Sequence, residues 1–243
     1  MPHRNSASAS TPPRHAVEPF HNPISPEKFR DIAGATPGRT ILLLRHAERP
    51  SIAEDDPTFG QHLGLTPAGE QDALALGRRL HGIEPCAFAA SPMRRTKETA
   101  RFVAKGMARH DAAVQDAPEV GLGGLWVTDL AETHRQYEIE GAGPATDRYL
   151  RDGHFNGYHS VADGTRLMTD WILNADFGAR HAIVFSHDTF IAAYLQGLGV
   201  RKFNSANWIG YLQGAALVQD AAGAWSAHYC VPDPRDFANV FIQ

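Results

Sequence analysis

The amino-acid sequence predicts an α/β fold. We expect a three-layer sandwich in which helices cover both faces of a mainly parallel central sheet, with a small irregular cap insertion. The chain has 243 residues, a length at which one large α/β domain is the commoner arrangement. From residue 39 onward, short apolar runs alternate with segments of helical period, and this alternation is typical of a parallel sheet.

The first 38 residues differ in composition from the rest. Serines alternate with alanines at positions 6 to 10, and prolines are frequent up to Pro26. Proline interrupts the hydrogen bonding of helices and strands, and no apolar run marks a secretory signal. We therefore expect residues 1–38 to be a disordered or loosely packed N-terminal tail and residues 39–243 to form a single domain.

Short apolar runs predict the strands of this domain. Each run is bounded by turn-forming or helical residues, as expected of strands in a buried sheet. The expected strands span residues 40–44, 86–90, 114–115, 182–185, 215–218 and 225–229.

Helical periodicity fills most of the intervals between these runs. Thr66 and Pro67 form an N-cap followed by a proline at the first helical position, and Gly82 ends that segment. A second helix is expected to begin at Ser91-Pro92, because apolar side chains recur on one face as far as Met107. The expected helices span residues 67–81, 92–107, 165–176 and 191–198.

Two segments lack a clear period and are expected to form the cap: residues 50–64 and 118–162. Glycines recur through the second segment and interrupt any long helix, although residues 126–139 could form one. The residues that would discriminate between substrates are expected in these two segments.

The composition excludes several classes of protein. The formal net charge is −4, whereas sequence-independent nucleic-acid binding needs a surplus of basic side chains. Apolar runs such as residues 41–44 are far shorter than the roughly 20 residues that cross a bilayer. Cys86 and Cys230 form no CxxC pair, which disfavours a thiolate zinc site. We expect a cytoplasmic protein without a nucleic-acid partner, a membrane partner or a cofactor.

Charged side chains and histidines follow three of the predicted strands directly. Ligands of such sheets gather at the carboxyl ends of the strands, so these side chains are expected to meet in one pocket. They are Arg45, His46, Arg49, Arg95, His187 and Asp188.

This set of side chains suits phosphate-ester chemistry. The planar guanidinium of arginine binds phosphate oxygens with paired hydrogen bonds. A neutral imidazole can attack phosphorus and form a covalent phosphohistidine, and a carboxylic acid can protonate the leaving alkoxide. Because the arginines and the second imidazole supply positive charge, no metal ion is expected to be needed.

The ordered motifs resemble the signatures of the histidine phosphatase superfamily, the phosphoglycerate mutase and acid phosphatase group. They are Arg45-His46-Ala47-Glu48, Ser91-Pro92-Met93-Arg94-Arg95-Thr96 and Ser186-His187-Asp188. The resemblance covers roughly residues 39–200. It implies that His46 is the phosphorylated nucleophile and that Arg45, Arg95 and His187 hold the phosphoryl oxygens. Where the family usually has glycine after the first histidine, this chain has Ala47.

The resemblance leaves two candidates for the proton donor. Arg49 and Asp188 resemble the acid phosphatase and phytase branch, in which the aspartate is the donor. The short chain and its Ser-Pro-x-x-Arg segment resemble the mutase branch, in which a glutamate after the third strand is the donor. Glu119 stands at about that place. The mutase pattern expected around Glu119 is absent, so we favour Asp188. Arg49 is a candidate phosphate ligand or a rim residue.

These observations together predict a metal-independent phosphomonoesterase that acts on a small phosphorylated molecule through phospho-His46. Two alternatives stay open. One is a phosphomutase of the phosphoglycerate mutase type, which would return the phosphoryl group to another hydroxyl. The other is a binding module that keeps the pocket without the chemistry. The sequence does not identify the substrate.

Overall fold

The computed structural model describes residues 16–232 except positions 54, 55, 57 and 59. In this part of the chain, seven strands form one sheet in the order β1-β7-β6-β2-β5-β3-β4. The strands are β1 (Val17–Ile24), β2 (Thr40–Arg45), β3 (Cys86–Ala90), β4 (Val114–Asp116), β5 (His181–Ser186), β6 (Gly214–Gln219) and β7 (Trp225–Cys230).

Helices occupy the connections, together with two short 3-10 turns. The helices are α1 (Pro26–Ala35), α2 (Pro67–Leu80), α3 (Arg94–Gly106), α4 (Leu130–Glu140), α5 (Ala142–Asp152), α6 (Val161–Asn174) and α7 (Asp188–Gly197), and the turns are Pro118–Val120 and Ser205–Asn207. None of the helices in the described residues is long and apolar enough to cross a membrane.

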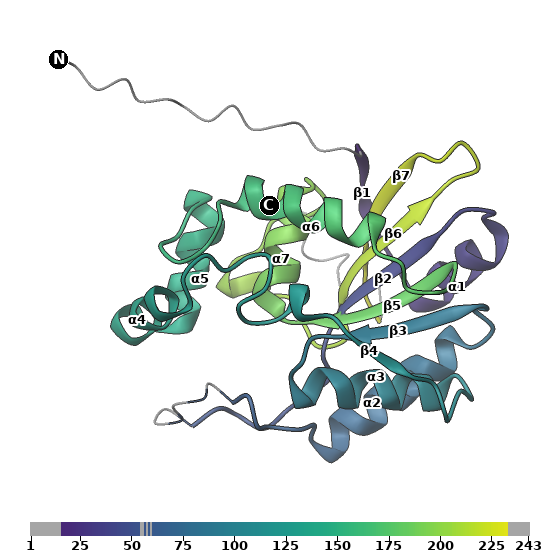
Figure 1. Ribbon diagram of the computed structural model, residues 1–243, viewed down its shortest axis with the longest axis horizontal. Coiled ribbons are helices and arrows are strands. Elements are labelled where there is room, and N and C mark those ends of the chain that lie inside the picture. Colours follow the sequence, from purple (N-terminus) through teal and green to yellow (C-terminus); the bar gives the residue numbers. More distant parts are fainter. Residues whose placement is uncertain (1–15, 54–55, 57, 59, 233–243) are drawn as a thin grey trace.

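The sheet is mainly parallel, as predicted. β2 pairs in parallel with β5, β5 with β3, and β3 with β4, whereas β6 runs antiparallel to both β2 and β7. Helices α2 and α3 lie on one side of the sheet and α6 and α7 on the other (Figure 1). The predicted three-layer α/β architecture is therefore confirmed.

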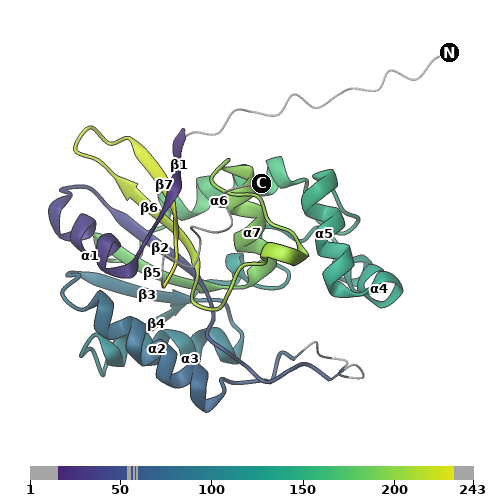
Figure 2. The ribbon, with the colours of Figure 1, turned by 180° about the vertical axis from the view of Figure 1, so that it is seen from behind.

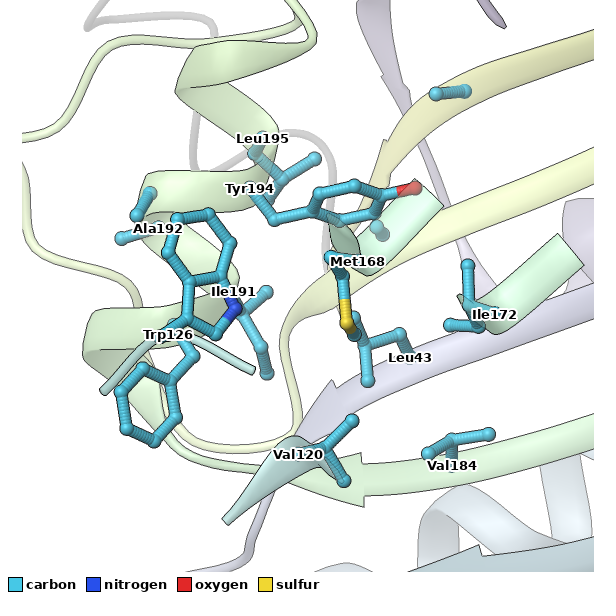
Figure 3. Close-up of a cluster of buried hydrophobic side chains, with 14 of the residues drawn as sticks. Leu43, Val120, Trp126, Met168, Ile172, Val184, Ile191, Ala192, Tyr194 and Leu195 are labelled. Carbon is cyan, nitrogen blue, oxygen red and sulfur yellow. The ribbon is translucent and has the colours of Figure 1, made fainter. Parts of the chain in front are cut away.

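Alternation along β2 divides the core between these two layers. Ile41 and Leu43 belong to the cluster that packs under α6 and α7, while Leu42 and Leu44 belong to the cluster under α2 and α3. All four side chains are at most 1% exposed. Figure 3 shows the first cluster, with Leu43 and its neighbours beneath the two helices. Because both faces are buried, the strand is apolar at four consecutive positions, 41–44, which is why it was predictable.

The prediction of a loosely packed tail over residues 1–38 is wrong for the described residues from 16 onward. β1 pairs in parallel with β7 at the edge of the sheet, and Pro19 and Pro23 lie within it. Proline is tolerated in an edge strand because its missing N–H removes no ladder hydrogen bond on the open side. Residues 1–15 lie outside the described residues.

Helix α1 is also part of the fold. Ser25 accepts a hydrogen bond from the Lys28 N–H as the N-cap, and Pro26 occupies the first turn, where proline fits best. The helix buries Phe29 in the cluster under α2, and Glu27 pairs with Arg79 of α2. Pro26, one of the prolines that suggested disorder, therefore marks the start of helix α1 (Figure 2).

The predicted cap segment 118–162 is more regular than its glycines indicated. It contains α4 and α5, and Gly141 separates them with a φ of 82° that few other residues adopt without strain. These two helices extend away from the sheet in both ribbon views (Figures 1 and 2). Helix α4 begins at Leu130 rather than Trp126, because Asp129 is its N-cap and accepts from the Glu132 N–H.

Candidate active site

The register of the parallel strands brings the three predicted motifs together. Arg45 lies opposite Ser186, and Ala90 lies opposite Phe185, so β2, β5 and β3 end side by side. The His46 N–H donates to the Ser186 carbonyl at 3.1 Å, and the Ser91 N–H donates to the Phe185 carbonyl at 3.0 Å. The residue after each strand is thereby fixed at one edge of the sheet.

The His46 imidazole is held in one neutral tautomer. Its Nδ1 lies 2.7 Å from the Ala47 carbonyl oxygen, and a carbonyl can only accept, so Nδ1 carries the hydrogen. Nε2 then has a free lone pair, which accepts from the Arg95 Nε at 3.2 Å. Burial is the main cause that lowers the pKa of His46 to about 3, and the charges of Arg95 and Arg45 act in the same direction. At neutral pH, Nε2 therefore carries no hydrogen and keeps its lone pair.

Arg95 connects the two histidines. Besides His46, its guanidinium donates to the Gly60 carbonyl at 2.7 Å and contacts the His187 Nδ1 at 3.5 Å. The ring centroids of His46 and His187 are 5.6 Å apart, in an edge-to-face arrangement. Burial lowers the pKa of Arg95 to about 10, so the guanidinium stays cationic at neutral pH. The two histidines therefore flank one buried cation.

A chain of hydroxyl groups fixes the His187 ring from behind. The Ser91 Oγ lies 2.9 Å from the His187 Nε2 and 2.9 Å from the Thr96 Oγ1. The Thr96 hydroxyl has carbonyl acceptors at 2.7 and 2.8 Å, so its hydrogen goes to a carbonyl. Ser91 must then donate to Thr96 and accept from His187. The His187 Nε2 carries the hydrogen, which leaves Nδ1 as the acceptor that faces Arg95.

Asp188 is the carboxylate of the site. Its Oδ2 lies 2.9 Å from the Arg45 Nη2 and accepts from the Trp208 indole N–H at 3.3 Å, while Oδ1 accepts from the Thr189 N–H at 2.9 Å. Burial raises the pKa of Asp188, but the charge of Arg45 together with these hydrogen bonds outweighs it and lowers the pKa below the ordinary value. The carboxyl group is ionised when the site holds no substrate.

Arg45 is fixed on several sides. Its Nη1 donates to the Ile209 carbonyl at 2.6 Å, and its guanidinium carbon lies 4.2 Å from the centroid of the Tyr211 ring. Stacking and two hydrogen-bonded nitrogens hold the cation in place. Arg45 therefore keeps its positive charge beside the Asp188 carboxylate.

A cavity of about 470 Å³ opens over these groups. One end is built from the predicted site residues and the N-terminus of α7, whose partial positive charge favours an anion. The other end is formed by α4, α5 and the Ser205–Asn207 turn. The lining residues are His46, Arg49, Ile52, Arg95, Leu122, Tyr137, Ala142, Gly143, Thr146, Asp147, Tyr158, His187, Asp188, Thr189, Phe190, Ser205 and Trp208.

The structure brings six of the seven predicted site residues together and separates one. His46, Arg49, Arg95, His187 and Asp188 line the cavity, and Arg45 pairs with Asp188 beneath it. Glu119 is not among the lining residues and borders a separate hollow with His159. Its half-buried carboxyl lies in the Pro118–Val120 turn.

Sequence reasoning gave no role to four side chains of the site. Ser91 and Thr96 belong to a motif that was recognised, but their contacts with His187 depend on the tertiary fold. Trp208 and Tyr211 lie in the irregular connection before β6, where no period or spacing marks them. No signal in the sequence could have found these two aromatic residues.

The described residues contain no group of three or more histidine, cysteine, aspartate or glutamate side chains placed to hold a metal ion. Arg45, Arg49 and Arg95 supply positive charge at the site, and the N-terminus of α7 adds partial positive charge.

Several solved structures are similar to this chain. A mycobacterial glucosyl-3-phosphoglycerate phosphatase aligns at 20% identity with a TM-score of 0.49, over 79% of this chain and 98% of its own. A structure described as mycobacterial hydrolase 1 aligns at 22% identity with a TM-score of 0.48, over 78% and 96%. The protein histidine phosphatase SixA, solved with tungstate, aligns at 14% identity with a TM-score of 0.44, over 78% and 94%.

Comparison at the level of sequence gives the assignment. No protein with a curated description matches the chain. The family model of the histidine phosphatase superfamily (branch 1) matches residues 41–218, a range that holds all three strand-end motifs and all the strands between β2 and β6. With the two histidines and Arg95 converging at one edge of the sheet, the match establishes that this chain belongs to the histidine phosphatase superfamily.

Proposed function

We propose that this protein is a phosphomonoesterase that works without a metal ion and acts on a small phosphorylated molecule through a phosphohistidine on His46. The observation that carries the proposal is the fixed tautomer of His46. A buried, neutral imidazole directs the lone pair of Nε2 at a guanidinium, and a phosphoryl group would take the place of that guanidinium contact.

The first step transfers the phosphoryl group to the protein. The His46 Nε2 attacks phosphorus, a bond forms between nitrogen and phosphorus, and the bond from phosphorus to the ester oxygen breaks. Arg95 turns its N–H groups from the imidazoles to the phosphoryl oxygens, and Arg49 reaches the same end of the cavity. The leaving alkoxide takes a proton from the Asp188 carboxyl and departs as the alcohol.

The second step returns the protein to its starting state. The Asp188 carboxylate accepts a proton from a water molecule as that water attacks phosphorus, and the bond to Nε2 breaks. Asp188 gives this proton to the departing inorganic phosphate, so the carboxylate is restored. Because Asp188 is ionised before substrate binds, the proton for the first step enters with the phosphate monoester, whose second pKa is about 6.

Purified protein and a His46→Ala variant provide the test, with an aryl phosphate as substrate. We expect the variant to lose all measurable turnover, and wild type to form an acid-labile phosphoprotein in a quench experiment. His154→Ala is the matched control, since His154 is exposed and outside the cavity. Turnover that persists in His46→Ala would overturn the assignment, and loss of wild-type activity after chelation would refute metal independence.

The same experiment separates the alternatives. A phosphomutase would pass the group from phospho-His46 to a second hydroxyl of the substrate in preference to water, so isomer interconversion would exceed phosphate release. A binding module would bind phosphate and form no phosphoprotein.

A further inference from the structure

The cap end of the cavity differs in chemistry from the phosphate end. Arg49, Arg95 and both histidines lie at the phosphate end, where the loop after β2, α3 and the end of β5 meet. The lining residues contributed by α4, α5 and the following loop include no lysine, arginine or histidine. They are Tyr137, Ala142, Gly143, Thr146, Asp147 and Tyr158.

Asp147 gives this end a negative charge. It lies on α5 and lines the cavity, with Gly143 one turn earlier and Thr146 directly before it in the chain. The basic residues of the same helix are turned to other acids, since Arg148 pairs with Glu140 and Arg151 pairs with Asp152. No ion pair of Asp147 occurs within the described part of the chain. The start of α5 adds a partial positive charge of about one half, which is less than the full charge of the carboxylate.

The hydroxyl groups at this end have few hydrogens to offer a ligand. The Thr146 hydroxyl donates to the Ala142 carbonyl at 2.7 Å, and the hydroxyls of Tyr137 and Tyr158 share one hydrogen across 2.7 Å. Burial raises the pKa of both phenols, so each keeps its hydrogen at neutral pH. Of the three hydroxyl hydrogens of Thr146, Tyr137 and Tyr158, one then has no acceptor among these groups so far. The Thr146 oxygen can accept it from Tyr137. Besides the Ser205 hydroxyl and the backbone N–H groups of Ala142 and Gly143 at the start of α5, this end therefore presents acceptors and aromatic surface.

If the alcohol part of the substrate carried a second phosphate or a carboxylate, that anion would meet hydrogen-bond acceptors and the Asp147 carboxylate here. It would lose hydration, and the full negative charge of Asp147 would repel it more strongly than the partial positive charge at the start of α5 would attract it. An apolar body would instead cover the aromatic and aliphatic surface that Tyr158, Phe190 and Leu122 provide. An ammonium or hydroxyl group could donate to Asp147, and a cation also gains from neighbouring aromatic faces.

We infer that the leaving group of the substrate is an alcohol with an apolar or aromatic body and an ammonium or other hydrogen-bond donor that Asp147 accepts, and that a second anionic group is excluded. This inference rests on the proposed phosphatase function, because it names the substrate class of the same cavity. Asp147 is then a specificity-determining residue that contacts the alcohol part of the ester.

Three aryl phosphates of similar leaving-group basicity provide the test. They carry a para aminomethyl, methyl or carboxymethyl group, so they differ mainly in charge at one position. For wild type we expect kcat/KM to fall from the ammonium to the methyl to the carboxylate ester, with about tenfold or more between the first and the last, as two units of charge near one carboxylate imply. Asp147→Asn should reduce that ratio about tenfold. Asp152→Asn, a paired acid of the same helix outside the cavity, should leave the ratio unchanged.

The outcomes separate this inference from the proposed function. Turnover of all three esters at equal kcat/KM, or preference for the carboxylate, would refute the inference and leave the phosphatase standing. Absence of turnover would refute the phosphatase, and calorimetric binding of benzylphosphonates with the same three para groups then decides the inference. The order ammonium, methyl, carboxylate in affinity would sustain it, and any other order would overturn it.

Discussion

Replacing Asp188 by asparagine tests the proton donor while keeping the shape of the side chain. Asp188 accepts hydrogen bonds through both oxygens, from Arg45 and Trp208 on one and from the Thr189 N–H on the other. An amide must direct its NH₂ group at one of these donors. A buried donor facing a donor costs about 1–3 kcal/mol, so we expect a modest loss of stability and a folded protein.

The effect on catalysis depends on the leaving group. General acid catalysis contributes about 10²–10⁴-fold in rate, and an alkyl phosphate needs nearly all of it because its alkoxide is strongly basic. We expect kcat/KM of Asp188→Asn to fall about 10³-fold with an alkyl phosphate and about tenfold with 4-nitrophenyl phosphate, whose phenolate leaves without much help.

The pH profile gives a second readout of the same idea. The pKa of Asp188 is lowered in the free site, so the productive complex must take its proton from the ester, whose second pKa is about 6. For wild type, kcat/KM with the alkyl phosphate should therefore fall as pH rises above about 6, and the 4-nitrophenyl ester should show a weaker fall.

Steady-state assays on both esters with wild type, Asp188→Asn and Glu119→Gln decide the matter. Glu119 lies outside the lining of this cavity, so Glu119→Gln should resemble wild type with both esters. Equal losses for the two esters in Asp188→Asn would refute Asp188 as the donor, and a selective loss of alkyl-ester activity in Glu119→Gln would transfer the role to that residue.

Three further predictions follow from the same geometry. Ser91→Ala removes the acceptor that fixes the His187 Nε2–H, so kcat/KM should fall about tenfold with a fold-stability loss of about 1–3 kcal/mol; unchanged kinetics in a folded variant would show that the contact has no positioning role. The pKa of His46 is about 3 in the folded chain and about 6.5 in the unfolded chain, so the unfolded state binds more protons below 6.5 and stability falls with acid. Between pH 7 and pH 5, the free energy of unfolding should therefore fall by about 2 kcal/mol more in wild type than in His46→Ala. If denaturant melts show the same pH dependence of unfolding free energy in both proteins, the lowered pKa of His46 is contradicted. Phe29→Ala should destabilise the fold by about 3–5 kcal/mol if α1 belongs to the core, whereas a change below about 1 kcal/mol would return residues 26–35 to the tail.

For the described residues from 16 onward, the prediction of a loosely packed tail is wrong because the effect of a proline depends on its position. Pro19 and Pro23 lie in an edge strand and Pro26 lies in a first helical turn, and these are positions that tolerate a missing N–H. Composition counts prolines without showing which hydrogen bonds the fold requires. The edge position of β1 exists only after β7 has paired with β6, so the local sequence does not contain it.

The two candidates for the proton donor show a similar limit. Asp188 and Glu119 each follow a predicted strand, and sequence alone allowed either one. The side chain of Asp188 meets Arg45 because β2 and β5 are neighbours in register. Glu119 follows β4 at the far edge of the sheet, beyond β3, and its turn leaves the carboxyl group at a different hollow.

The sequence by itself determined the layers of this protein and the side chains that stand at the strand ends. Apolar runs and helical periods are local patterns, and a parallel sheet places the carboxyl ends of its strands at one edge whatever the rest of the chain does. Only the tertiary structure decided which of those side chains touch, how His187 carries its hydrogen, and that the cap end of the cavity is acidic and aromatic. The direction of the hydrogen bond at His187 and the chemistry of the pocket depend on groups far apart in the chain that meet within about 3 Å, and no local pattern encodes such a meeting.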